Sequence, residues 1–186
     1  MKKILVLLLL LTNVLFLHAE ETSGTKPEKK ILTFLGKVME NGIRVREDKN
    51  VSSRTLGNLY KGEKISIFER TQTKEKIQDM EDYWYRIEYQ GQKAWVYGHF
   101  LIVEEPVENL TGTVNTNNVH IRNEFDLGTQ ITGKVFKDDH FPVVSKTNKQ
   151  LLVDDKQDFW YKILLSDNTY GWIFGEFLTL STSTKK

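Results

Sequence analysis

The sequence predicts an all-β protein with two small barrels in tandem, and three observations support this prediction. First, the chain contains an internal repeat, because residues from Gly36 onward match residues from Gly112 onward at an offset of 76 positions. Second, each copy consists of short strand-like segments between turn residues, and no apolar face recurs at helical spacing. Third, each copy is only about 68 residues long, and several short strands in so small a unit favour a barrel closed on itself.

The chain begins with a segment that is typical of a secretory signal peptide. Lys2 and Lys3 form a basic start, residues 4–17 are mainly apolar, and Leu17-His18-Ala19 fits a cleavage site. This apolar stretch is shorter than the roughly 20 residues that a membrane-spanning helix needs, so cleavage is favoured over an uncleaved anchor. We therefore expect residues 1–19 to be a signal peptide and the mature chain to be exported, periplasmic or secreted, without a membrane anchor.

Composition divides the rest of the chain into two barrels and three connecting or terminal segments. Polar segments without aromatic residues predict a disordered linker at 20–30 and a disordered tail at 181–186. The first barrel is expected over residues 31–103 and the second over residues 112–180. Between them, the acidic segment 104–111 predicts a linker that is short enough to restrict the relative motion of the barrels.

Four strand-like segments recur in the same order in the two copies. An extra residue in the second copy falls in turn-like sequence, at 165–170 against 89–93, where a hairpin tip tolerates an insertion. Apolar residues alternate in Ile65-Ser66-Ile67 and Phe141-Pro142-Val143, and Pro142 predicts an edge position because proline donates no hydrogen bond. The recurring pairs are Ile43–Arg46 with Val119–Arg122, Leu59–Glu63 with Val135–Asp139, Asp82–Ile87 with Asp158–Ile163, and Ala94–Leu101 with Gly171–Leu178.

These segments resemble the bacterial SH3 (SH3b, SH3-like) family. Its consensus opens with an apolar residue, Asn, Val and Arg, passes through a Lys-Gly turn and ends in a Gly-Trp-Val strand. Here the opening strand is similar to 43–46 and 119–122, the turn to Lys61-Gly62, and the closing strand to Gly171-Trp172-Ile173. The resemblance implies two tandem SH3-like β-barrels that bind cell-wall material or peptides outside the cytoplasm. The family's usual Ser-Gly-Pro loop after the opening Arg is replaced in both copies.

The sequence lacks the parts that an enzyme or a metal site requires. It contains no cysteine, no Gly-x-Ser-x-Gly elbow, no His-Glu-x-x-His motif and no phosphate-binding glycine loop. His99, His120 and His140 are scattered without metal-ligand spacing, and the pairs Asp138-Asp139 and Asp154-Asp155 are predicted to be solvated turns. We therefore predict a non-enzymatic protein without cofactor or metal. Basic and acidic residues nearly balance, at 26 and 25, which argues against a nucleic-acid partner.

The aromatic residues are the candidate ligand-binding groups. Period-two geometry puts Tyr85 and Ile87 on the core face of their strand and Trp84 on the other face, among charged residues; Trp160 is predicted to point outward in the same way. By analogy with eukaryotic SH3 domains, the six candidates form two grooves, one from Trp84, Tyr97 and Phe100 and one from Trp160, Phe174 and Phe177. The alternative interpretation is that all six cover the ends of the barrels. Core positions are predicted for Tyr85, Ile87, Val96, Ile163 and Ile173.

The function that these features favour is binding in the bacterial envelope. The first hypothesis is an exported, non-enzymatic tandem SH3b protein that binds peptidoglycan or its peptides, with two weak sites on a short tether that gain avidity. The second is a secreted or periplasmic adaptor that recognises extended or Pro-rich peptides of a protein partner. A third possibility is that the barrels pack against each other through the grooves.

Overall fold

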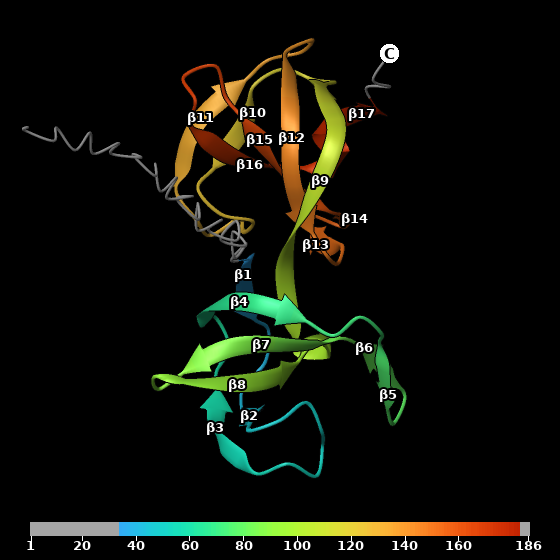
Figure 1. Ribbon diagram of the computed structural model, residues 1–186. Helices are drawn as coiled ribbons and strands as arrows, with labels where there is room; N and C mark the ends of the chain where they lie inside the picture. Colours follow the sequence, from blue (N-terminus) through green and yellow to red (C-terminus); the bar gives the residue numbers. More distant parts are fainter. Residues whose placement is uncertain (1–33, 183–186) are drawn as a thin grey trace, which may run out of the picture. The chain divides into compact units, whose positions relative to one another are not determined.

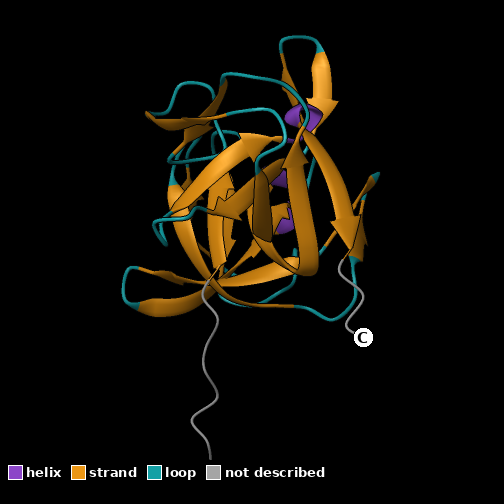
Figure 2. Cartoon of the chain, turned by 90° about the horizontal axis from the view of Figure 1, so that it is seen from above, coloured by secondary structure: helices purple, strands orange, loops and turns teal. Residues whose placement is uncertain are grey.

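The computed structural model describes residues 34–182, and strands make up most of this range (Figures 1 and 2). Within it there is no α-helix, and helical structure is limited to two 3₁₀ turns, η1 (Gly98–Phe100) and η2 (Gly175–Phe177). The predicted all-β fold is confirmed. The predicted signal peptide and the polar segment 20–30 lie outside the described residues. Among residues 34–182, no helix is long and apolar enough to cross a membrane.

The first barrel is an antiparallel sheet whose strands follow the order β9-β1-β4-β7-β8-β2-β3. Alternation explains its core, since Ile65 and Ile67 of β4 are buried while Ser66 between them is exposed. A small hairpin, β5 with β6, leaves the barrel between β4 and β7. The strands are β1 (Phe34–Val38), β2 (Ile43–Arg46), β3 (Thr55–Leu59), β4 (Lys64–Arg70), β5 (Glu75–Ile77), β6 (Met80–Asp82), β7 (Trp84–Tyr89), β8 (Gln92–Tyr97) and β9 (Leu101–Val114).

The second barrel repeats this arrangement, with the order β17-β9-β12-β15-β16-β10-β11. The end of β9 stands here where β1 stands in the first barrel, and β17 takes the place of the start of β9. A second small hairpin, β13 with β14, corresponds to β5–β6. The strands are β10 (Val119–Arg122), β11 (Ile131–Val135), β12 (His140–Thr147), β13 (Leu151–Val153), β14 (Lys156–Asp158), β15 (Trp160–Leu164), β16 (Tyr170–Phe174) and β17 (Leu178–Thr182).

The extra residue of the second copy lies in the loop of a hairpin, as predicted. In the first copy β7 and β8 are joined by Gln90 and Gly91, with positive φ angles of 52° and 77° that suit a tight two-residue turn. In the second copy a longer loop joins β15 and β16, and the Leu165 backbone N–H donates to the Thr169 carbonyl across it at 2.9 Å. The insertion therefore leaves the strand register on either side unchanged.

Strand β9 belongs to both barrels. Its first residues, Leu101 to Val103, pair with β1, and its following residues, Glu104 to Pro106, pair with β12. Residues 104–111, which were predicted to be a linker, thus connect the barrels as part of a continuous strand (Figure 1). The pairing continues at Leu110, after a local irregularity at Asn109, whose φ is 54°.

Two further strand positions differ from or refine the expectation. Ser181 and Thr182, expected in a disordered tail, pair with β9 as the last residues of β17, because backbone pairing does not depend on their polar side chains. Pro142 pairs with β9 only, and the pairing of β12 with β15 begins at Val143. The missing N–H of Pro142 therefore costs no hydrogen bond in the β12–β15 ladder.

Each barrel has its own apolar core, and a third cluster joins them. The predicted core residues are buried, with Tyr85, Ile87 and Val96 in the first core and Ile163 and Ile173 in the second. The third cluster combines Ile102 of β9 with aromatic residues of the second barrel and partly buried Met39 of the first; its buried members are Ile102, Phe125, Trp160, Trp172 and Phe174. Each half therefore has its own apolar core, and a smaller apolar cluster joins the two halves.

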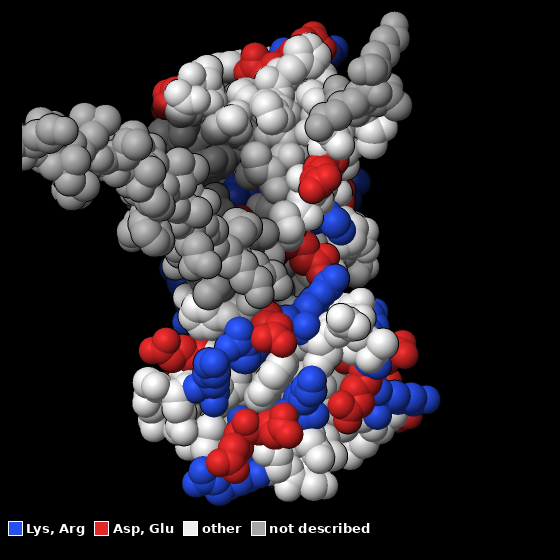
Figure 3. Space-filling model, in the orientation of Figure 1, with Lys and Arg blue, Asp and Glu red and all other residues white. Residues whose placement is uncertain are grey.

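Polar contacts also join the two barrels. Lys37 and Lys64 of the first barrel form ion pairs with Asp126 and Glu124 of the second, the former at 2.6 Å. Asn148 exchanges two hydrogen bonds of 2.8 Å with the backbone of Val103. On the face shown in Figure 3, basic and acidic side chains of the first barrel are interspersed rather than gathered into a patch of one sign.

Candidate ligand-binding grooves

The first groove lies on the outer surface of the first barrel, and we define it by the residues that line it. It is a hollow of about 380 Å³ whose wall includes Trp84 and Tyr97 from neighbouring strands and Phe100 from η1. The sequence-predicted trio of this copy is therefore brought together. The other lining residues are Glu40, Asn41, Gly42, Ile43, Arg44, Arg46, Val51, Ile77 and Met80.

The second groove lies at the equivalent place on the second barrel. It has a volume of about 270 Å³, and Trp160, Phe174 and Phe177 are part of its wall. Every lining residue except Asp154 stands at the repeat position of a residue that lines the first groove. The other lining residues are Thr116, Asn117, Asn118, Val119, His120, Arg122, Leu127, Val153 and Asp154.

The two tryptophans were predicted to face solvent, and this prediction is wrong. Trp84 is 1% exposed and Trp160 is 2% exposed. Each lies on the outer face of its strand as alternation requires, but a hairpin folds over that face, β5–β6 in the first barrel and β13–β14 in the second. The hairpins contribute Ile77 and Val153 to the respective grooves. The tryptophans thus form the floor of each groove, and its accessible aromatic surface is provided by the half-buried Phe100 and Phe177.

The aromatic pair in the floor has the same geometry in both grooves. The rings of Trp84 and Tyr97 lie 5.4 Å apart at an interplanar angle of 59°, and those of Trp160 and Phe174 lie 5.5 Å apart at 57°. Both values fall in the range of favourable tilted aromatic contacts. In each copy the tryptophan backbone N–H also donates to the hydroxyl oxygen of an equivalent threonine at 3.1 Å. The floor is therefore a rigid feature of the fold, present twice.

The hairpin over the floor is attached by different forces in the two copies. In the first, the Trp84 indole N–H donates to the Glu75 carboxylate at 2.7 Å, and the Tyr97 hydroxyl donates to the Glu75 carbonyl, also at 2.7 Å. Burial raises the pKa of Tyr97, so its hydroxyl remains a donor at neutral pH. In the second copy Leu151 replaces Glu75 and packs on the apolar cluster. The first hairpin is held by polar contacts and the second by apolar ones.

An arginine at the end of the opening strand holds the loop beside each groove. The Arg46 guanidinium donates to the Ser53 carbonyl at 2.8 Å, and the equivalent Arg122 donates to the Thr129 carbonyl at 2.6 Å. Both arginines also line their grooves. The replaced Ser-Gly-Pro loop is thus anchored by the same contact in both copies, and each groove has a permanent positive charge in its wall.

The charge at the groove rims differs between the copies. The first groove has the exposed Arg44 where the second has the exposed His120. Each groove also includes one carboxylate, that of Glu40 in the first groove and that of Asp154 in the second. Arg44 therefore gives the first groove one more permanent positive charge than the second groove has. An anionic group on a ligand is therefore favoured more by the first groove than by the second.

Sequence reasoning found the aromatic residues of the grooves but missed their arginines and hairpins. Arg46 and Arg122 were recognised only as parts of the opening strand. A usable signal was present, because a charged residue that recurs at the end of a buried repeat strand needs a local polar partner. The hairpins left only a weak signal, since each strand in them has three residues.

Comparison with known families places two domains on this chain. Residues 41–102 match the bacterial SH3 domain, and residues 107–176 match the GW (Gly-Tryp) dipeptide domain. The Gly-Trp dipeptide of the second match is Gly171-Trp172, in which Trp172 is buried against Phe125 with ring centroids 5.1 Å apart. No curated protein matches the chain.

Solved structures that are similar to this chain include three with low sequence identity. NlpC2 and NlpC1 of Trichomonas vaginalis are 14% and 13% identical, with TM-scores of 0.29 and 0.30 over 80% and 82% of this chain. The chain spans 48% and 47% of those two proteins. Ly7917 is 8% identical over 80% of this chain and 63% of its own, with a TM-score of 0.31.

Proposed function

Because the chain consists of two tandem domains of the bacterial SH3 type, the second of which matches the GW domain, we propose that it is an exported, non-enzymatic protein that binds peptidoglycan of the bacterial cell wall. Domains of both kinds are binding modules of the cell wall rather than catalytic units. The proposed location is the periplasm or the cell exterior. The proposed partner is peptidoglycan, including its peptide stems, and the proposal involves no cofactor and no membrane anchor.

The observation that carries this proposal is the duplication of one groove. Two hollows with equivalent lining residues lie at equivalent places, and each combines a rigid aromatic floor, an accessible phenylalanine and an arginine. Aromatic faces and cationic or amide-binding groups suit sugars and peptides, which offer flat apolar faces beside polar groups. A polymer with repeating units can engage two such grooves at once.

Binding through two grooves explains how shallow sites can hold a polymer. The hollow of about 380 Å³ lies at the low end of the range for small-molecule sites and that of about 270 Å³ lies below it, so each groove alone is expected to bind weakly. When one part of a ligand polymer occupies the first groove, other repeating units of the same polymer are present at a high effective concentration near the second groove. The shared strand β9 keeps the grooves on one connected body.

The test is sedimentation of the purified chain, residues 20–186, with isolated cell-wall sacculi. We expect the protein to pellet with sacculi and the double variant Phe100→Ala, Phe177→Ala to bind at least about tenfold more weakly, because it loses the accessible aromatic surface of both grooves. These two residues are better targets than the buried tryptophans, whose removal would destabilise the barrels. Circular dichroism and thermal unfolding establish that the variant is folded.

A matched control is available on the same surface. Tyr60 and Phe136 are equivalent positions of the repeat, are 54% and 50% exposed, and line neither groove. The variant Tyr60→Ala, Phe136→Ala should therefore sediment like the unmodified chain. The proposal fails if the unmodified chain stays in the supernatant, or if the folded groove variant pellets as well as this control. If the protein no longer pellets with sacculi that have been treated with protease, the result would instead favour the adaptor that binds a protein partner.

A further inference from the structure

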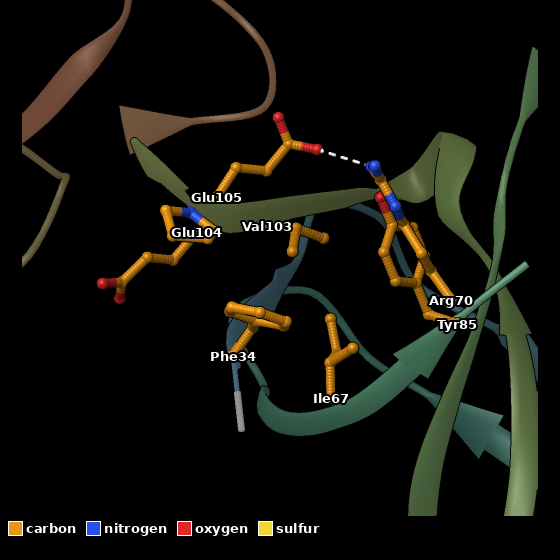
Figure 4. A pocket seen from close by; sticks show the side chains of 8 residues that line it. Phe34, Ile67, Arg70, Tyr85, Val103, Glu104 and Glu105 are labelled. Carbon is orange, nitrogen blue, oxygen red and sulfur yellow. Dashed lines mark hydrogen bonds and ion pairs between the residues drawn. The ribbon is translucent and has the colours of Figure 1, made fainter. Parts of the chain in front are cut away.

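A separate cavity lies outside both grooves, where β1, β4 and β7 of the first barrel meet β9 (Figure 4). It has a volume of about 240 Å³. Phe34, Ile67 and Val103 form its apolar wall, and Ile67 and Val103 are almost completely buried. None of its lining residues lines either groove. The cavity is therefore a second type of site on the same domain.

Tyr85 supplies to this cavity a hydroxyl hydrogen that has no acceptor. The residue is 2% exposed, and its buried hydroxyl oxygen lies beside Arg70, whose guanidinium can only donate, so that no acceptor for the hydroxyl hydrogen is found among residues 34–182. Figure 4 shows the Tyr85 ring beside Arg70 on one side of the cavity, with Phe34 across from them. Buried hydroxyls in native proteins are usually hydrogen-bonded, so the hydroxyl hydrogen of Tyr85 favours an occupant of the cavity that carries an acceptor. Burial raises the pKa of Tyr85 to about 12, so the group is a neutral donor.

The charged residues at the rim are already paired with each other. Arg70 forms an ion pair with Glu105 at 3.0 Å and lies over the Tyr83 ring at 4.3 Å. Glu104 forms an ion pair with Lys162 at 2.9 Å. The Arg70–Glu105 pair is exposed, but the Glu104–Lys162 pair is partly buried, so a charged ligand that displaced one member of the latter pair would leave the other unpaired there, which is costly. The rim therefore favours a neutral ligand.

We propose that this cavity binds a small neutral amide, in which an apolar branched or aromatic group fills the space between Phe34, Ile67 and Val103, and the carbonyl oxygen accepts a hydrogen bond from Tyr85. The volume of about 240 Å³ is large enough for an amide with about seven or eight non-hydrogen atoms. Such a group occurs at the side chain and carbonyl of an apolar amino-acid residue in a peptide. The proposal does not depend on the function of the grooves.

The test is a nuclear magnetic resonance titration of the chain, residues 20–186, with isovaleramide as the probe. We expect saturable shifts of the Ile67 and Val103 methyl resonances. The variant Tyr85→Phe keeps the ring and removes only the hydroxyl, so we expect it to bind about tenfold more weakly. It should remain folded, because the hydroxyl that it removes donates to no residue of the structure and Arg70 keeps its ion pair with Glu105.

The second barrel provides the control variant. Tyr161 is the repeat equivalent of Tyr85, and its hydroxyl is not one of the buried unpartnered atoms within the described range. The variant Tyr161→Phe should therefore leave isovaleramide binding unchanged. The proposal is overturned by the absence of saturable shifts, or by equal binding to the Tyr85→Phe chain. It is also overturned if binding appears only after residues 20–33 are removed, because that result assigns the cavity to the chain's own segment before Phe34.

Discussion

At the scale of single residues, we expect ionisation of the Tyr85 hydroxyl to lower the stability of the folded chain at high pH. Burial is the main cause, and the negative charges of Asp82 and Glu105 add to it, so its pKa rises to about 12 against about 10 for a free tyrosine. Between these values the unfolded chain has lost the proton while the folded chain retains it. The contribution of the protonated Tyr85 hydroxyl to the free energy of unfolding is therefore complete below about pH 10 and is lost as the pH rises toward 12.

We predict that the free energy of unfolding falls more steeply with rising pH in the unmodified chain than in the variant Tyr85→Phe. For one proton the free energy of unfolding falls by up to about 1.4 kcal/mol per pH unit in this window. Urea unfolding at a series of pH values from about 9 to 11 measures it, and Tyr60→Phe, at a position that is 54% exposed, is the control. Equal slopes for Tyr85→Phe and the unmodified chain would show that the group titrates normally.

Sequence alternation predicts the inward side of a strand better than it predicts the exposure of the outward side. Tyr85 and Ile87 are buried as predicted because the barrel covers one face of β7 whatever else the chain does. The burial of Trp84 depends on a separate hairpin that lies nearby only in the folded structure. The residue type was still informative, since a tryptophan among charged neighbours did identify the place of the groove.

At the scale of elements, the hairpin β5–β6 is the least autonomous part of the first barrel. Two strands of three residues cannot be stable by themselves. Glu75 fixes the hairpin to Trp84 and Tyr97 through its carboxylate and its carbonyl. The groove wall that Ile77 and Met80 provide is therefore expected to depend on this attachment.

We predict that Glu75→Ala loosens the hairpin and destabilises the first barrel by about 1–3 kcal/mol, because the buried Trp84 indole N–H loses a charged acceptor. Urea unfolding gives the free energy, and the Trp84 indole proton resonance reports the local change. Glu81→Ala, an exposed glutamate on the same hairpin, should change stability by less than about 0.5 kcal/mol. An unshifted indole resonance in Glu75→Ala would contradict the assigned contact.

The repeat was the strongest source of prediction at this scale. Alignment of the two copies located the main barrel strands because buried strands must keep both their length and their alternation. It did not locate the small hairpins, because their sequences differ. At one pair of equivalent positions, Glu75 fixes the first hairpin by hydrogen bonds and Leu151 fixes the second by apolar packing. Different interactions that produce the same geometry leave no shared sequence pattern.

At the scale of the whole molecule, the continuity of β9 couples the two barrels. Pairing with the first barrel ends at Val103, and pairing with the second begins at Glu104, so no unpaired residue separates them. We predict that insertion of two glycines between these residues lets the barrels tumble independently. Nuclear spin relaxation should then give shorter rotational correlation times for both barrels than in the unmodified chain.

The control for this experiment is the same insertion between Gln90 and Gly91, at a hairpin tip where the second copy already has a longer loop. It should leave the correlation times nearly unchanged. If the barrels of the unmodified chain already tumble independently, β9 does not act as a rigid connection.

The sequence anticipated neighbouring barrels but not the way in which they meet. Residues 36–103 carry 12 basic and 10 acidic residues, and residues 112–180 carry 7 basic and 9 acidic ones. The first barrel is thus slightly basic and the second slightly acidic, and two ion pairs, Lys37 with Asp126 and Lys64 with Glu124, connect them. Phe125 stands where the first copy has Lys49, and it completes the apolar contact with Ile102. Residues 104–111 were predicted to be a linker from their acidic composition. The prediction missed the strand because composition does not reveal which residues pair in a sheet.

The sharing of β9 also determines where the chain can be cut. A fragment that starts at Val107 would keep the closing residues 110–114 but would lose Glu104, Glu105 and Pro106, the partners of Ser145 to Thr147 in β12. The backbone of that segment would then form a bare edge, to which a strand of another molecule can add. Isolated second halves are therefore expected to self-associate, and a soluble fragment must begin no later than Glu104.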